Sequence, residues 1–328
     1  NRLYFEQAGL SLPDRDYYLK DDAKFSRVRE EFIAYAEKMH LLLGDTAEEA
    51  TKNAVSILLL ETRLARAALT ATERRDEEKQ YNPMTIAELS LHARDIRWHA
   101  YLQNLGAPGD HAYIIVRQPA FITECDKIIR EAGEDERALR DLKAYLRWHV
   151  VNSVAGKLSR NFADLQFSFY GTVLAGTTEQ RPRWERVLDA VNGVLGEALG
   201  EMYVERHFPP KSKERVHELV SDLQEVFRER VSKLSWMGED TKRRALAKLD
   251  TFTRKLGYPE KWRDYSHFRV SVAVSYAENY LRGCEVESLR QLQKIDKKVD
   301  KAEWGMTPQT VNAYYNPPWN EVVFPAGI

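Results

Sequence analysis

Residues 211–235 read KSKERVHELVSDLQEVFRERVSKLS, a run whose apolar residues recur with the period of an α-helix. The apolar positions lie three or four residues apart and are Val216, Leu219, Val220, Leu223, Val226, Phe227, Val231 and Leu234. At 3.6 residues per turn such positions gather on one side of a helix, and the charged residues between them face water. The stretch therefore predicts one long amphipathic helix.

Similar patterns occupy most of the chain on both sides of this helix. They cover about 23–43, 46–71, 118–132, 135–157, 183–207, 239–256 and 270–293. Thr46 with Glu49 and Thr85 with Glu88 form capping boxes, in which a hydroxyl and a carboxylate satisfy free amides at a helix start. No repeat of 20 to 50 residues, the range typical of solenoids, is found. We therefore predict a mainly α fold with one large, non-repeating helical lobe over residues 1–295.

The composition changes after a lysine-rich stretch at 294–301. The sequence TVNAYY at 310–315 and EVVF at 321–324 are typical of strands, and the NPPW sequence at 316–319 between them is typical of a turn. We predict a β-hairpin here and a domain boundary near 295–302, so that residues 296–328 form a second part of the protein.

Composition excludes several classes of function. The 328 residues carry 49 Lys and Arg against 50 Asp and Glu, a formal net charge of −1, so electrostatics give no reason to expect a nucleic-acid partner. No apolar run approaches the roughly 18 residues that a membrane span needs. Two cysteines cannot build a disulfide framework.

The two ends of the sequence suggest a longer protein. Asn1 is not a methionine, and the apolar run at 322–324 lies close to Ile328, so we expect the chain to be part of a longer protein.

Motifs for catalysis are missing from the chain. A zinc hydrolase helix needs two histidines four residues apart, but the one His-Glu pair, His217 and Glu218, is followed by Ser221 at the second position. Nucleophile-elbow and phosphate-loop motifs are also absent. We predict no catalytic residue and no metal ligand in these 328 residues.

The predicted strand at Val311–Tyr315 is the one candidate binding element. An exposed strand edge can accept an extended peptide, and an Asn side chain offers both a donor and an acceptor to a peptide backbone. Asn312 is suited to this role. The alternative is that Asn312 is an ordinary structural residue before a turn.

Two sequences at the end of the chain, EWGMTPQTVNAYYNP at 303–317 and NEVVFPAGI at 320–328, resemble the neprilysin-like zinc metallopeptidases, the M13 peptidase family. Further similarities lie in GLSLPDRDYYL at 9–19, LSWM at 234–237 and LGYPEK at 256–261. The resemblance extends over essentially the whole chain. The spacing of these motifs and the small number of cysteines in the chain are similar to those of bacterial members of the oligopeptidase type.

The resemblance implies a fold and a set of roles. Residues 1–295 would be the helical lobe that covers the substrate cavity, and 296–328 would begin a thermolysin-like zincin catalytic lobe with its first β-hairpin. Asn312 and Ala313 would hold the substrate backbone. Ile328 would line the pocket for the residue that follows the cleaved bond, the S1′ pocket.

The resemblance also implies a cofactor and a partner. Zinc would be bound by an H-E-x-x-H helix and a further carboxylate that lie beyond Ile328. This chain would then need a C-terminal part or subunit carrying those ligands, would act on peptides, and would be inactive alone. A catalytically inactive helical binding or scaffold protein of the same fold is the alternative, and intact or altered histidines in the continuing sequence distinguish the two. The resemblance also favours a periplasmic or secreted location for this protein over a cytoplasmic one, because family members often act outside the cytoplasm.

Overall fold

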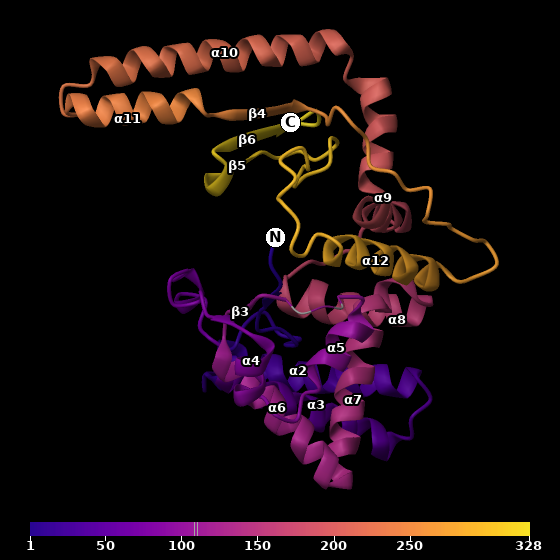
Figure 1. The fold of residues 1–328 in the computed structure, drawn as a ribbon. Helices are drawn as coiled ribbons and strands as arrows, with labels where there is room; N and C mark the ends of the chain where they lie inside the picture. The colour runs from indigo at the N-terminus through magenta and orange to yellow at the C-terminus, as the bar shows by residue number, and fades with distance from the viewer. Residues whose placement is uncertain (108, 110) are drawn as a thin grey trace. The chain divides into compact units, whose positions relative to one another are not determined.

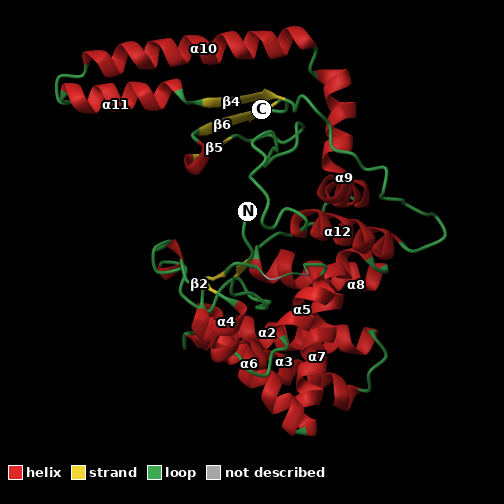
Figure 2. Ribbon diagram, in the orientation of Figure 1, coloured by secondary structure: helices red, strands yellow, loops and turns green. Residues whose placement is uncertain are grey.

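The computed structural model describes residues 1–107, 109 and 111–328. It divides into two compact units (Figure 1). Unit 1 comprises residues 1–181, 272–281 and 285–298, and unit 2 comprises 182–271, 282–284 and 299–328. Twelve α-helices are found among the described residues, together with a few short strands (Figure 2). The predicted mainly α fold is therefore confirmed.

Unit 1 is built from helices and one small sheet. Its helices are α1 (Asp16–Leu19), α2 (Ala23–Leu42), α3 (Ala47–Ala67), α4 (Ile86–His92), α5 (Trp98–Leu105), α6 (Pro119–Glu134), α7 (Glu136–Val154), α8 (Arg160–Gln166), a π-helix (Phe167–Leu174) and most of α12 (Tyr276–Leu292). Its strands are β1 (Tyr4–Phe5), β2 (Pro83–Met84) and β3 (Ile114–Val116). Strand β3 lies in the middle, parallel to β1 and antiparallel to β2.

The predicted helix starts are correct. In both capping boxes the threonine hydroxyl accepts from the N3 amide while the N3 carboxylate accepts from the threonine N–H. Thr46 thus opens α3, and Thr85 opens α4. These contacts span only three residues, so the local sequence is enough to place them.

Aromatic side chains fill the largest core of unit 1. Phe32, Trp148 and Phe169 are almost fully buried and come from α2, α7 and the π-helix. Tyr35 stacks on Phe169 at 4.9 Å, and the Trp148 ring meets Phe32 edge-on at 5.6 Å. Burial of large apolar surface from three helices therefore holds the unit together.

A buried carboxylate, Glu61 of α3, fastens residues 9–19 to this core. Its Oε2 accepts hydrogen bonds from the Ser11 amide at 3.0 Å and from the Tyr18 hydroxyl at 2.5 Å. Its Oε1 accepts from the Ser11 hydroxyl at 2.7 Å and lies 3.0 Å from His149 Nε2. Burial, together with the negative charge of Glu61, strongly raises the pKa of Tyr18. The Tyr18 phenol therefore stays protonated and donates to the carboxylate.

Unit 2 contains three long helices and a second sheet. The helices are α9 (Arg183–His207), α10 (Pro210–Lys233) and α11 (Glu239–Asp250), and the strands are β4 (Thr253–Gly257), β5 (Tyr314–Asn316) and β6 (Glu321–Pro325). Helix α9 is kinked at Leu195, whose φ of −128° is not helical. Helices α10 and α11 lie side by side (Figure 1).

The second sheet confirms the predicted hairpin and adds a strand that the sequence analysis missed. Strand β5 pairs with β6 in antiparallel register, Tyr314 opposite Val323, across a turn that ends at Asn320 with φ 48°. Strand β4 pairs with the other side of β6 in parallel. The helical pattern predicted for 239–256 was too long, because α11 ends at Asp250 and the chain then extends into β4.

The functional division into a substrate-covering lobe over 1–295 and the start of a catalytic lobe over 296–328 stays a prediction. The two compact units describe a different property, since the chain passes between them at 181/182, 271/272, 281/282, 284/285 and 298/299. Strand β4, from within the first predicted part, pairs with β6 in unit 2.

Candidate functional site

The candidate site lies along one edge of the second sheet. The strand order is β4-β6-β5, so β5 has a partner on one side only. In the part of the chain that the structure describes, no strand pairs with the outer edge of β5. Such an edge presents backbone donors and acceptors that an extended peptide can satisfy.

Asn312 and Ala313 come directly before β5. The prediction placed both within a strand over 311–315, but the strand begins at Tyr314. The reason is local, because Asn312 Oδ1 accepts a hydrogen bond from the Ala313 amide at 2.8 Å and so takes a donor that a strand would use. The Asn312 side chain is exposed. Its Nδ2 amide makes no hydrogen bond within the described chain and can donate to a ligand.

The segment leading to Asn312 is held against α9. Gln309 Nε2 donates to Gly196 O at 2.9 Å and also to the side chain of Asn192. A Cβ on Gly196 would lie 2.6 Å from Thr307 Cγ2, so the helix needs glycine there to let the segment approach. The same holds at Gly200, where a Cβ would lie 2.7 Å from Pro308 Cδ.

Ile328 belongs to a neighbouring segment that is anchored in the same place. Gly327 N donates to Pro308 O at 2.8 Å, and Ala326 N donates to Gly257 O at the end of β4, also at 2.8 Å. The Ile328 side chain itself is 63% exposed. The backbone at Pro308 thus ties the segment that carries Ile328 to the one that carries Asn312 and Ala313.

A buried ion pair joins the other two strands of this sheet, β4 and β6. Lys255 Nζ of β4 lies 2.7 Å from Glu321 Oε2 of β6 and also donates to Glu303 O at 2.7 Å. The Tyr314 hydroxyl accepts from the Gly305 amide at 2.9 Å, and burial raises the pKa of Tyr314. Sequence reasoning missed this support because no short motif links residues so far apart in the chain.

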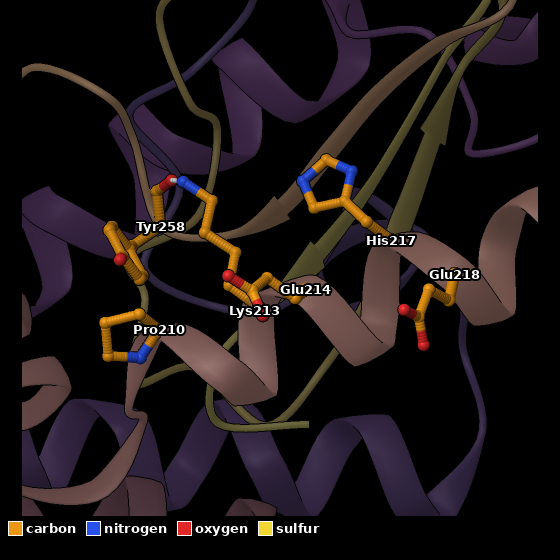
Figure 3. A pocket seen from close by; sticks show the side chains of 6 residues that line it. All are labelled: Pro210, Lys213, Glu214, His217, Glu218 and Tyr258. Atoms are coloured by element: carbon orange, nitrogen blue, oxygen red, sulfur yellow. Dashed lines mark hydrogen bonds between the residues drawn. The ribbon is translucent and has the colours of Figure 1, made fainter.

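A separate hollow of about 450 Å³ lies on α10 (Figure 3). It is lined by Pro210, Lys213, Glu214, His217, Glu218 and Tyr258. The Lys213 ammonium is already engaged, since it lies 2.6 Å from Glu260 Oε1 and 4.0 Å from the centre of the Tyr258 ring. Its hydrogen bond holds the pKa of Glu260 below the usual range. The charged group of Lys213 in this hollow is therefore engaged in structural contacts.

The side chains of the described residues do not fit a zinc site. Among them, no group of three or more His, Cys, Asp or Glu is placed to hold a metal ion. His217 and Glu218 line the hollow on α10 without a third ligand. Within the same residues, no helix has both the length and the apolar composition needed to cross a membrane.

Comparison with known proteins agrees with this architecture. The family model described as Peptidase family M13 matches residues 1–259. Neprilysin-3 of Drosophila melanogaster is 29% identical over 338 residues, and endothelin-converting enzyme 1 of Bos taurus is 31% identical over 342 residues. These alignments cover 99% and 100% of this chain but 43% and 44% of the relatives.

Two solved structures share the fold. The zinc metalloprotease Zmp1 of Mycobacterium tuberculosis in its open state matches with a TM-score of 0.88 and 39% identity, over 99% of this chain and 49% of Zmp1. PepO of Lactobacillus rhamnosis HN001 matches with a TM-score of 0.87 and 22% identity, over 100% of this chain and 51% of PepO, which shows the fold alone. The chain thus spans about half the length of these proteins. The resemblance predicted from the sequence is confirmed, and this chain belongs to peptidase family M13.

Proposed function

We propose that these 328 residues are the N-terminal part of a zinc-dependent endopeptidase and that they align the peptide substrate. Membership of the M13 family supports the class of reaction. The observation that carries the proposal is the open edge of β5, with Asn312 and Ala313 immediately before it. Both residues lie in a segment that hydrogen bonds and close packing fix to α9.

In this proposal the substrate runs along the sheet edge in extended form. The Asn312 amide donates to a carbonyl of the peptide, and the Ala313 backbone accepts from a peptide N–H. Ile328 offers an apolar surface to the side chain that follows the cleaved bond. Main-chain hydrogen bonds of this kind supply affinity for many peptide sequences, and pockets for single side chains supply selectivity.

The zinc ligands are proposed to lie in a C-terminal part or subunit outside these residues. The described side chains offer no ligand set, and the relatives are about twice as long as this chain. We therefore assign no catalytic residue to the chain. Taken alone, it is proposed to bind no catalytic zinc and to cleave no peptide.

The test compares residues 1–328 with the full-length product of the gene. Zinc content and cleavage of a fluorogenic peptide are measured for both. We expect one zinc ion and turnover for the full-length protein and neither for the 328 residues. Stoichiometric zinc with turnover by the 328 residues would refute the division of roles. A full-length protein that binds peptide without zinc or turnover would instead be the inactive binding protein of the same fold.

A further inference from the structure

Helix α9 carries a row of short residues on the side that faces the segment before Asn312. Asn192, Gly196 and Gly200 follow one another at four-residue intervals, so they lie on one side of the helix. A Cβ added at Gly196 or Gly200 would lie 2.6 Å and 2.7 Å from side chains of residues 307–309. This segment therefore packs directly on the backbone of α9.

Helix α9 is kinked beside this row, at Leu195 (Figure 1). The Glu197 amide, which in a regular helix donates to the carbonyl four residues earlier, donates to the Tyr265 hydroxyl at 3.2 Å. A side chain that inserts into the backbone ladder is a common cause of a helix kink, so Tyr265 accounts for this one. The Glu197 carboxylate in turn accepts from the Arg263 amide at 3.0 Å and lies 3.1 Å from the Arg263 guanidinium. The loop that carries Tyr265 is thus fixed to the kinked turn.

Gln309 joins this kinked turn to the candidate site. Its Nε2 donates to Gly196 O, the carbonyl directly after the non-helical Leu195, and also to the Asn192 side chain. Its Oε1 is buried and has no hydrogen-bond partner among the described residues. A buried oxygen without a partner costs free energy, so a methionine of similar length would fill this position at a smaller cost. What glutamine adds is a fixed direction, because two hydrogen bonds from one amide group set the position of residue 309 on the helix.

The position of Asn312 depends on two anchors. On one side lies the turn of residues 307–310, whose ends are joined by an amide–carbonyl hydrogen bond of 3.0 Å. On the other side β5 begins at Tyr314. Between the anchors, the backbones of Val311 and Asn312 make no hydrogen bond to another element in the part of the chain that the structure describes. A shift of the turn is therefore passed on to Asn312.

We propose that Gln309 is a positioning residue for the peptidase reaction, an inference that rests on the proposed function. Gln309 fixes the turn on α9 and so places the Asn312 amide where the substrate backbone receives its hydrogen bond. It acts through Asn312 and not by contact with the substrate, because its own amide atoms lie against α9. A misplacement of about 1 Å can lower a rate roughly a hundredfold, so loss of this anchor affects catalysis more than it affects stability.

Kinetics and stability of the full-length protein test the proposal. Gln309→Met removes both hydrogen bonds and keeps the length of the side chain. The matched control is Gln224→Met, which removes a bond of the same kind, from Nε2 to Leu249 O of α11 at 3.0 Å.

We expect Gln309→Met to lower kcat/KM for a fluorogenic peptide about tenfold, mainly through a raised KM, with unchanged zinc content. Its urea midpoint of unfolding should move no further than that of Gln224→Met, whose kinetics should equal those of the unaltered protein. Unchanged kcat/KM for Gln309→Met would overturn the proposal.

A double-mutant cycle with Asn312→Ala separates positioning from a general structural effect. Because Gln309 is proposed to act through Asn312, Gln309→Met should lower kcat/KM by less than about twofold once residue 312 is alanine. The same tenfold loss in both backgrounds would show that Gln309 acts elsewhere and would overturn the proposal.

Hydrogen exchange supplies a readout that needs no activity. The Ala313 amide donates to Asn312 Oδ1, so its exchange rate reports how firmly Asn312 is held. We expect exchange at Ala313 to be about fivefold faster in Gln309→Met than in the unaltered protein, and unchanged in Gln224→Met.

The two readouts distinguish failure of this inference from failure of the proposed function. An active zinc enzyme in which Gln309→Met changes neither kinetics nor exchange at Ala313 defeats the inference alone. A full-length protein without zinc or turnover defeats the proposed function, and faster exchange at Ala313 in Gln309→Met then still supports the placement of Asn312 by Gln309.

Discussion

Lys255 and Glu321 form a buried ion pair between β4 and β6, with 2.7 Å between Nζ and Oε2 and side chains that are 8% and 1% exposed. Strand register places Glu321 opposite Thr253, so Lys255 is the diagonal neighbour on the same face of the sheet. The Lys255 ammonium also lies 5.3 Å from the centre of the Trp319 ring. This pair joins the strand that follows α11 to the hairpin that carries the candidate site.

Breaking the pair from one side should destabilise unit 2. Glu321→Gln leaves the Lys255 ammonium buried without a counter-charge, and we expect the free energy of unfolding to fall by about 3 kcal/mol in urea titrations. The control is Glu229→Gln, which breaks an exposed pair with Lys233 and should cost less than about 0.5 kcal/mol. The double variant Lys255→Met/Glu321→Leu should recover most of the loss. Similar losses for Glu321→Gln and Glu229→Gln would contradict this account.

Asn312→Ala should weaken substrate alignment in the full-length enzyme. Loss of one hydrogen bond to the peptide backbone should lower kcat/KM, through a raised KM or a lowered kcat. The loss corresponds to about 1 to 3 kcal/mol of transition-state stabilisation. Asn104→Ala, at an exposed position on α5, is the control and should leave the kinetics unchanged. Kinetics of Asn312→Ala equal to those of the unaltered enzyme would remove Asn312 from the site.

Ile328→Ala should change selectivity more than overall stability, because the Ile328 side chain is 63% exposed in this structure. For peptides with Leu after the cleaved bond, the variant loses apolar contact with the Leu side chain, and kcat/KM should fall. The fall corresponds to about 1 to 3 kcal/mol of transition-state stabilisation. For peptides with Ala at that position the change should be much smaller. A uniform reduction for both peptides would show that Ile328 does not contact this side chain.

Glu61→Ala should destabilise unit 1 strongly. The change leaves the part-buried Ser11 amide and the buried Tyr18 hydroxyl without their acceptor, which should cost about 3 kcal/mol or more in urea unfolding. Glu48→Ala on the same helix removes an exposed partner of Lys52 and should cost less than about 0.5 kcal/mol. If both variants unfold at the same urea concentration, the Glu61 network does not hold residues 9–19.

Stability of unit 1 should fall as the pH is lowered from 7 to 5, in part because of His40. Burial lowers the pKa of this fully buried histidine below its ordinary 6.5, although its hydrogen bond to Asp45 opposes the shift. The folded state therefore favours neutral His40, while the unfolded state takes up a proton below about pH 6.5. The stabilisation from neutral His40 is complete above that pH and is lost as the pH falls toward the folded pKa.

The measurement is the free energy of unfolding between pH 7 and pH 5. His40→Gln should show a shallower loss than the unaltered protein, and His99→Gln, at an exposed position on α5, should not differ from it. The other charges that face His40 do not produce the same effect. Burial raises the pKa of Asp45, but hydrogen bonds from Arg147 and His40 outweigh it and keep that pKa below its ordinary value of 3.8. Equal slopes for His40→Gln and the unaltered protein would contradict the prediction.

The local sequence was enough to predict the long helices, but not the short helices α5 and α8. The pattern over 211–235 predicted α10, which spans Pro210–Lys233, and the capping boxes at Thr46 and Thr85 gave the starts of α3 and α4. The hairpin of β5 and β6 was predicted as well. In each case the deciding contacts join residues within one helical turn or across one short turn, so a local period or motif records them.

Only the tertiary structure decided which distant segments meet. The pairing of β4 with β6 joins residues 68 positions apart, the Lys255–Glu321 ion pair spans 66 positions, and Glu61 binds Ser11 across 50 positions. Asn312 was proposed from the sequence as a candidate, but the attachment of its segment through Gln309 to α9 was not predicted. The physical reason is that such contacts depend on how whole elements pack. No local sequence pattern links residues that lie far apart in the sequence, so their contacts cannot be predicted from such a pattern.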